Sequence, residues 1–132
     1  MRKLSIGLVF SLVAVLTFTF AAADADAAKT IKLGFNIPLT GDNPDVGGSS
    51  KNAAEMYLKK SPKIDVGGKA YALKFIYDDN EYKAESAVKV STKLITEEEV
   101  LGIIGPQSSS QAVPAGEVAN NYATPMISPW ST

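Results

Sequence analysis

Three consecutive serines, Ser108, Ser109 and Ser110, stand where a short apolar run gives way to a segment of helical character. The first turn of a helix carries backbone N–H groups without intrahelical partners, and the helix dipole favours negative charge there. Serine hydroxyls add further donors. The pattern indicates a seat for a carboxylate or a phosphate. Plain helix capping is the alternative, because serine is also a favoured N-cap residue.

A second polar segment, residues 128–132, follows the next apolar run and holds the single tryptophan of the chain, Trp130. An indole ring in a polar loop beside a cleft can stack on a ligand. The alternative is that the ring packs on the neighbouring protein surface. Thr132 offers both a hydroxyl and a backbone N–H, so this segment is a second candidate for ligand contact.

Asp78 and Asp79 carry carboxylates of the kind that bind a metal or act as an acid pair. Adjacent residues of a strand point to opposite faces, so these two are not expected to share one site. We predict instead that Asp78, Asp79 and Asn80 offer caps for the following helix. Glu97–Glu99 is interpreted as a solvated charge run.

The composition excludes several classes of function. The 132 residues include no Cys and no His, and the formal net charge is −1. Disulfides, thiolate nucleophiles and imidazole ligands are therefore absent, and no metal or cofactor is expected. A nucleic acid partner is not expected either, since Lys and Arg are not clustered in excess. These absences favour binding over catalysis in a single globular domain.

The first residues have the pattern of an export signal. Arg2 and Lys3 precede an uncharged apolar stretch that runs to Ala23 and ends in small residues. Residues 1–23 are therefore predicted to be a cleavable signal peptide, with cleavage after Ala27 as the second choice. An uncleaved anchor is the alternative, since the stretch approaches the roughly 20 residues that span a membrane.

The rest of the chain alternates between two kinds of hydrophobic periodicity. Strands are predicted at 31–37, 71–77, 100–104 and 126–128, and helices at 48–60, 84–95 and 108–123. This order is typical of an α/β fold with an open parallel sheet and helices on both faces. In such sheets ligands bind at the carboxyl ends of the strands. We therefore expect the serines and the Trp130 segment to meet at one edge.

Four short motifs, in order and at suitable spacing, carry a family resemblance. They are IKLGFNIPLTG at 31–41, YDDN at 77–80, IIGP at 103–106 and MISP at 126–129. Together they resemble the amino-terminal lobe of the type I periplasmic binding proteins of branched-chain amino acid ABC transporters. The resemblance spans 31–132. It implies an exported periplasmic receptor whose two lobes close on a small ligand and deliver it to a membrane permease.

The resemblance also implies roles for particular residues. It places the serine that binds the ligand's carboxylate at Ser109, and the hydroxyl and N–H that hold its main-chain atoms at Thr132. The carbonyl that faces the ammonium falls at Trp130. The ligand's side chain is expected near Val46, where members often carry an aromatic residue. Val46 and the bulky Trp130 reshape that pocket, so the ligand is expected to be a branched-chain amino acid or a related amide or aromatic acid.

Residues 24–132 are expected to form the amino-terminal part of the ligand-binding lobe, with the second lobe absent, as a piece of a longer receptor. Two other functions remain open. A sensing domain of the same fold would act through a signalling partner. A serine hydrolase would use Ser109 with a Lys as base, but no G-x-S-x-G elbow is present and no Lys is near Ser109 in sequence.

Overall fold

The structure is a computed structural model that describes residues 30–131, so the predicted signal peptide and Thr132 lie outside the described residues. The described elements are β1 (Thr30–Ile37), α2 (Pro44–Lys60), β2 (Lys63–Val66), β3 (Lys69–Asp79), α3 (Ala84–Thr96), β4 (Gly102–Ile104), α4 (Ser109–Asn121) and β5 (Met126–Ile127). They build one five-stranded sheet in the order β2-β3-β1-β4-β5.

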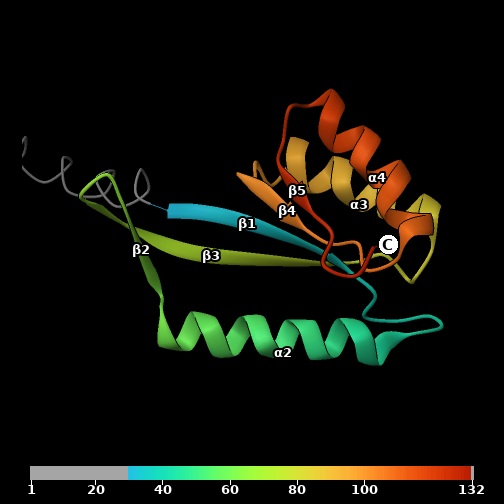
Figure 1. Ribbon diagram of the computed structural model, residues 1–132, viewed down its shortest axis with the longest axis horizontal. Helices are drawn as coiled ribbons and strands as arrows, with labels where there is room; N and C mark the ends of the chain where they lie inside the picture. The colour runs from blue at the N-terminus through green and yellow to red at the C-terminus, as the bar shows by residue number, and fades with distance from the viewer. Residues whose placement is uncertain (1–29, 132) are drawn as a thin grey trace, which may run out of the picture.

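Helices cover both faces of this sheet (Figure 1), α2 on one face and α3 with α4 on the other. The alternation of strand residues explains this arrangement. Leu33 and Phe35 of β1 face α2, whereas Gly34 points to the opposite face. A Cβ at Gly34 would lie 2.9 Å from Leu94 of α3. The predicted α/β fold with helices on both faces is confirmed.

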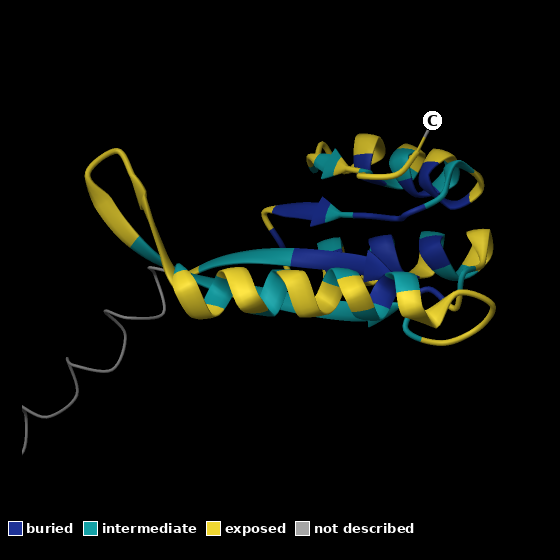
Figure 2. Ribbon diagram, turned by 60° about the horizontal axis from the view of Figure 1, so that its bottom comes forward, coloured by how far each residue is buried: buried dark blue, intermediate teal, exposed yellow. Residues whose placement is uncertain are grey.

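The main hydrophobic cluster lies between the sheet and α3, and it consists of Val90, Leu94, Val100 and Ile103. Figure 2 shows the buried residues gathered where β1 and β4 meet the two helices of this face. Helix α3 buries Ala87, Val90, Ser91 and Leu94, which recur at i, i+3, i+4 and i+7 and so form one face of the helix, while Ala84 is exposed.

Four strands are parallel as predicted, but β2 pairs antiparallel with β3 and was not predicted. Its four residues, Lys63–Val66, alternate polar and apolar side chains, but this run has only the minimum length of a strand pattern, and all four residues are exposed. Gly67 and Gly68 have φ values of 60° and 77°, which fit the two-residue turn of a hairpin. Gly67 and Gly68 therefore lie at the tip of a protruding hairpin (Figure 2).

The start of one helix also differs from the prediction. Helix α2 begins at Pro44 and not near Gly48, because proline is well suited to the first helical position. Helix α4 contains Pro114 as its sixth residue, in the second turn. There it removes the N–H that would otherwise bond to the carbonyl of Ser110.

Gly105 joins β4 to the loop before α4 in a conformation that other residues rarely adopt. Its φ is 101°, and a Cβ at this position would lie 2.2 Å from the carbonyl oxygen of Asn36 in β1. No side chain fits at that separation, so the close approach of the two strand ends requires glycine.

We predict that Gly105→Ala destabilises the protein by at least about 2 kcal/mol, because it combines a strained φ with a backbone clash. Gly48→Ala is the matched control. Gly48 lies inside α2, and a Cβ added there would have nothing within 4 Å, so this change should stabilise by about 0.5–1 kcal/mol. Urea unfolding measures both. Equal effects would show that the strand ends are not so close.

Candidate functional site

The carboxyl ends of four parallel strands meet at one edge of the sheet, called here the carboxyl edge (Figure 1). The register shows this directly, since Ile37 pairs with Asp79, Phe35 with Ile104, and Ile104 with Ile127. The loops that leave this edge include the serines and the Trp130 segment. The structure therefore brings together the two regions that the sequence singled out.

Ser108 is the N-cap of α4 and has extended backbone angles, with φ −136° and ψ 150°. Its carbonyl accepts hydrogen bonds from the N–H groups of Gln111 and Ala112. Its hydroxyl makes no capping bond and lies 2.9 Å from the hydroxyl of Ser110. The Ser108 side chain therefore does not cap α4. The amino end of α4, with its three hydroxyls, is a suitable position for an anion.

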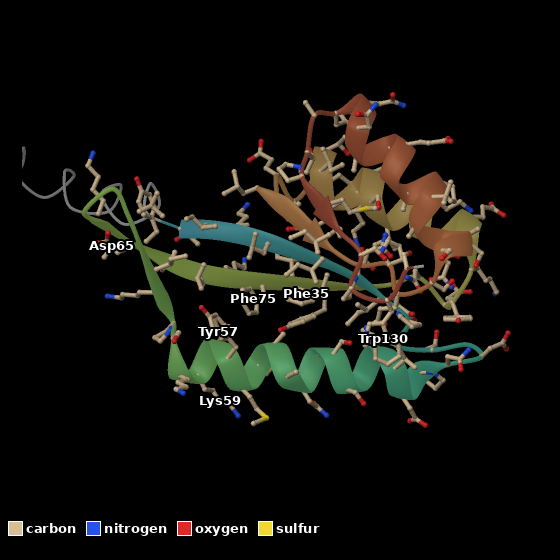
Figure 3. All side chains as sticks on the ribbon, viewed as in Figure 1. Phe35, Tyr57, Lys59, Asp65, Phe75 and Trp130 are labelled. Carbon is tan, nitrogen blue, oxygen red and sulfur yellow. The ribbon has the colours of Figure 1, made fainter. Side chains whose placement is uncertain are left out.

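The segment after β5 is tied to the loop between β4 and α4. The Ser128 hydroxyl donates to the carbonyl of Pro106 at 2.5 Å and lies 2.9 Å from the hydroxyl of Ser131. The N–H of Gly105 donates to the carbonyl of Ile127 at 2.8 Å. Trp130 lies at the carboxyl edge and is 63% exposed (Figure 3). The indole is therefore accessible to a ligand and is not packed into the described lobe.

Asp79 at the end of β3 organises the loop that follows β1. Its Oδ1 accepts hydrogen bonds from the N–H groups of Leu39, Thr40 and Glu81 at 2.8, 3.2 and 2.8 Å. Its Oδ2 accepts from the Thr40 hydroxyl at 2.5 Å. Burial alone would raise the pKa of Asp79, but these hydrogen bonds lower it below the usual value.

The predicted capping role of the Asp78–Asn80 segment is wrong. The N-cap of α3 is Lys83, and no side chain caps it. Asp78 forms an ion pair with Lys93 of α3 at 2.7 Å, while Asp79 binds the first loop. The two carboxylates therefore serve different partners, as the alternation of strand residues predicts.

Asn36 and Asn80 form a buried polar network that sequence analysis missed, and both are fully buried. Asn36 Nδ2 donates to the Ala87 carbonyl at 2.8 Å and to Ser91 Oγ at 2.9 Å, and Asn80 Nδ2 donates to Asn36 Oδ1 at 2.8 Å. The N–H of Tyr82 completes the network by donating to Asn80 Oδ1 at 2.9 Å. This network locks the ends of β1 and β3 to α3.

A groove of about 420 Å³ lies between α2 and the sheet, away from the serines. Figure 3 shows Tyr57 of α2 below Phe35 and Phe75 of the sheet in this region. Apart from Ser50 and the Tyr57 phenol the lining side chains are apolar. A carboxylate would find few donors there, so the groove does not fit the predicted anion seat.

Residues 30–132 match the sequence family described as periplasmic binding protein. The chain belongs to this family. Within residues 30–131, no group of three or more Asp, Glu, Cys or His side chains is arranged to hold a metal ion. No helix of that same part is long and apolar enough to cross a membrane.

Solved structures of type I periplasmic binding proteins share the fold. The substrate-binding protein LivJ of Streptococcus pneumoniae, in complex with isoleucine, is 30% identical with a TM-score of 0.70, covering 79% of this chain and 30% of that one. A solute-binding protein of Rhodopseudomonas palustris BisB5, in complex with 3,4-dihydroxybenzoic acid, is 26% identical with a TM-score of 0.70, covering 78% and 28%. An R. palustris solute-binding protein in complex with benzoate is 26% identical with a TM-score of 0.67, covering 76% and 27%. The chain thus spans less than a third of the length of these proteins.

In this periplasmic binding protein, Ser108, Ser109 and Ser110 lie in and before the first turn of α4, and Trp130 follows β5. Val46 is partly buried in the first turn of α2. Residues that sequence reasoning missed include Gln107, which is 4% exposed and directly precedes the serines. The sequence feature that could have indicated Gln107 is its position, a polar residue in the short loop between the buried strand β4 and helix α4.

We predict that Asp79→Asn destabilises this periplasmic binding protein at pH 7 by about 1–3 kcal/mol, because it removes the charge and places an amide among N–H donors. The lowered pKa of Asp79 means that its contribution is present above the unfolded value of about 3.9. That contribution is lost as the pH falls through the folded pKa.

The difference in unfolding free energy between Asp79→Asn and wild type should therefore shrink between pH 5 and pH 2. Denaturant unfolding over this range measures it, with Asp42→Asn, an exposed carboxylate of the same loop, as the control. A difference that stays constant with pH would remove Asp79 from this role.

Proposed function

We propose that this chain is the ligand-contacting part of an extracytoplasmic solute-binding protein that works with an ABC transporter permease. Residues 1–23 direct export and are removed, and 24–132 form the binding lobe in the periplasm. The ligand is a small carboxylate, a branched-chain amino acid or a related amide or aromatic acid. The arrangement that carries this proposal is the amino end of α4, with its serines, beside the Trp130 loop at the carboxyl edge.

The chemistry of the carboxyl edge supports a carboxylate ligand. Ser109 is the first residue of α4 and is partly buried. A carboxylate placed there meets the N–H groups of the first turn, the positive end of the helix dipole and a hydroxyl donor. Thr132 adds a hydroxyl and an N–H to the ligand's main-chain atoms. The carbonyl of Trp130 accepts from an ammonium when the ligand carries one.

The proteins of similar fold support the same ligand class. Isoleucine, 3,4-dihydroxybenzoic acid and benzoate are the ligands of three of them. These compounds have different side groups but share a carboxylate. The constant part of the ligand is therefore assigned to Ser109, and the variable part to the space near Val46 and Trp130.

Binding without catalysis is the proposed role. The sequence has no His to act as a base for Ser109, and the family and the similar structures are binding proteins. A sensing protein would use the same site and differ only in its partner, so the ligand experiments below apply to it equally.

We predict that Ser109→Ala in the full chain weakens binding of a carboxylate ligand by about 1.5–3 kcal/mol, the range for a hydrogen bond to a charged group. The panel for calorimetry is L-leucine, L-isoleucine, benzoate and 3,4-dihydroxybenzoate. Ser49→Ala is the matched control, because Ser49 is an exposed serine of α2, and it should leave the affinity unchanged.

Unchanged affinity of Ser109→Ala would remove this serine from the site. The wild-type protein should also leave ester and amide analogues of the bound ligand intact. Turnover of such a compound would replace the binding proposal with a hydrolase.

A further prediction concerns Trp130, the single tryptophan of the chain. Trp130 is 63% exposed, so its fluorescence should be quenched readily by iodide. A ligand that stacks on the ring should shift the emission to shorter wavelength and protect it from iodide. A spectrum that a saturating ligand leaves unchanged would place the indole outside the site.

A further inference from the structure

Gln107 and Ser50 connect the beginning of α2, which carries Val46, to the loop before α4, which carries the serines. Gln107 is 4% exposed, directly precedes Ser108, and its Nε2 donates a hydrogen bond to Ser50 Oγ of α2. Ser50 Oγ in turn donates to the carbonyl of Val46 at 3.1 Å. The donors and acceptors run in one direction, so a single hydroxyl satisfies both bonds. Val46 is thus linked to the serines through two side chains.

Little else fixes this end of α2 relative to β4. The apolar groove separates the following turns of α2 from the sheet, and Ser50, Ala53 and Ala54 line it opposite Ile104. On the β1 side the backbone is in close contact, since a Cβ at Gly47 would lie 1.8 Å from the Pro38 carbonyl oxygen. The first turn of α2 is therefore held by β1 on one side and by the Gln107–Ser50 contact on the other.

The Gln107 amide is not the most stabilising group for its position. Its Oε1 is buried and has no hydrogen-bond partner among residues 30–131. A buried acceptor without a partner opposes folding, and an apolar side chain of similar size would avoid that cost. Residues that break a local rule in this way are expected at functional positions.

We propose that the Gln107–Ser50 contact sets the spacing between Val46 and the serines, and so determines which side groups fit beside the bound carboxylate. This inference rests on the proposed function, in which Ser109 holds the carboxylate and Val46 lies near the side group. Neither Gln107 nor Ser50 touches the ligand. They are positioning residues that act on ligand size through the first turn of α2.

Ser50→Ala and Gln107→Leu both remove the contact and test this proposal. Ser50→Ala deletes one oxygen and keeps a good helix former. Ser50→Thr is the conservative rescue, since threonine retains a hydroxyl that can bond to the Val46 carbonyl, and the groove has room for the added methyl group. Ser49→Ala is the control for a serine of the same helix that is exposed.

The measurement is the ratio of dissociation constants for two ligands that share a carboxylate and differ in side-group size. The pairs are L-alanine with L-isoleucine, and benzoate with 3,4-dihydroxybenzoate. Ser50→Ala and Gln107→Leu should change the ratio by about threefold or more, within the range that a few ligand atoms contribute to selectivity. Ser50→Thr and Ser49→Ala should keep it within about twofold of wild type.

A purely structural role gives a different result. The thermal midpoint would then fall, and both affinities would weaken together at a constant ratio, which overturns the proposal. Gln107→Leu separates the two roles most clearly. It should keep or raise the midpoint of thermal unfolding while it changes the ratio of the two dissociation constants. If wild type binds neither pair, the proposed function fails and this inference with it. If wild type binds and the ratios stay constant, only this inference fails.

Discussion

Four parallel strands end at the same edge of the sheet, and each chain segment must leave that edge without burying unpaired backbone groups. This constraint governs the arrangement of the site. The Asp79 carboxylate accepts hydrogen bonds from three backbone N–H groups, two in the loop after β1 and one in the loop after β3. Ser128 satisfies the Pro106 carbonyl across the neighbouring pair of strands. Each bond that closes a loop also fixes the position of a segment that the ligand would meet.

Two kinds of polar group lie at the carboxyl edge: those whose hydrogen bonds hold the lobe together, and those that face outward. The asparagines of the buried network and Asp79 have their hydrogen-bonding capacity used by the protein. The amino end of α4 and the exposed Trp130 lie outside that network. A rigid layer of satisfied polar groups therefore supports a layer that is suited to an anionic ligand. This is the usual division in α/β sheets that bind ligands at the strand ends.

Much of the fold was predictable from the sequence because the signals are local. The alternation of Ile31, Leu33 and Phe35 predicts β1, and the apolar residues near Ile103 predict a buried strand. The helical periodicity of residues 84–95 likewise predicts α3, which buries Ala87, Val90, Ser91 and Leu94 on one face. Strand β2 was missed because its alternation of polar and apolar residues extends over only four positions, and its pairing with β3 depends on the Gly67–Gly68 turn.

The candidate site was predictable only as far as residue type and strand order allow. The serines and Trp130 could be placed at one edge because both follow parallel strands. Contacts between distant segments could not be deduced, such as Asn36 with Asn80 or Gln107 with Ser50, which are separated by 44 and 57 residues. They depend on the register of the sheet and on where α2 crosses it. For the same reason Asp79 was assigned to the helix that follows it and not to the earlier loop that it binds.

The central claim is that a small carboxylate binds at the carboxyl edge and not in the apolar groove under α2. Backbone amide chemical shifts, recorded while benzoate or L-isoleucine is titrated into the full chain, test it directly. If the carboxylate binds at the carboxyl edge, the shifts will concentrate at Val46–Gly47, Gln107–Ser110 and Ser128–Ser131, with the β2–β3 hairpin unaffected. Shifts concentrated at Ala53, Tyr57 and Phe75, which line the groove, would contradict this and place the site beneath α2.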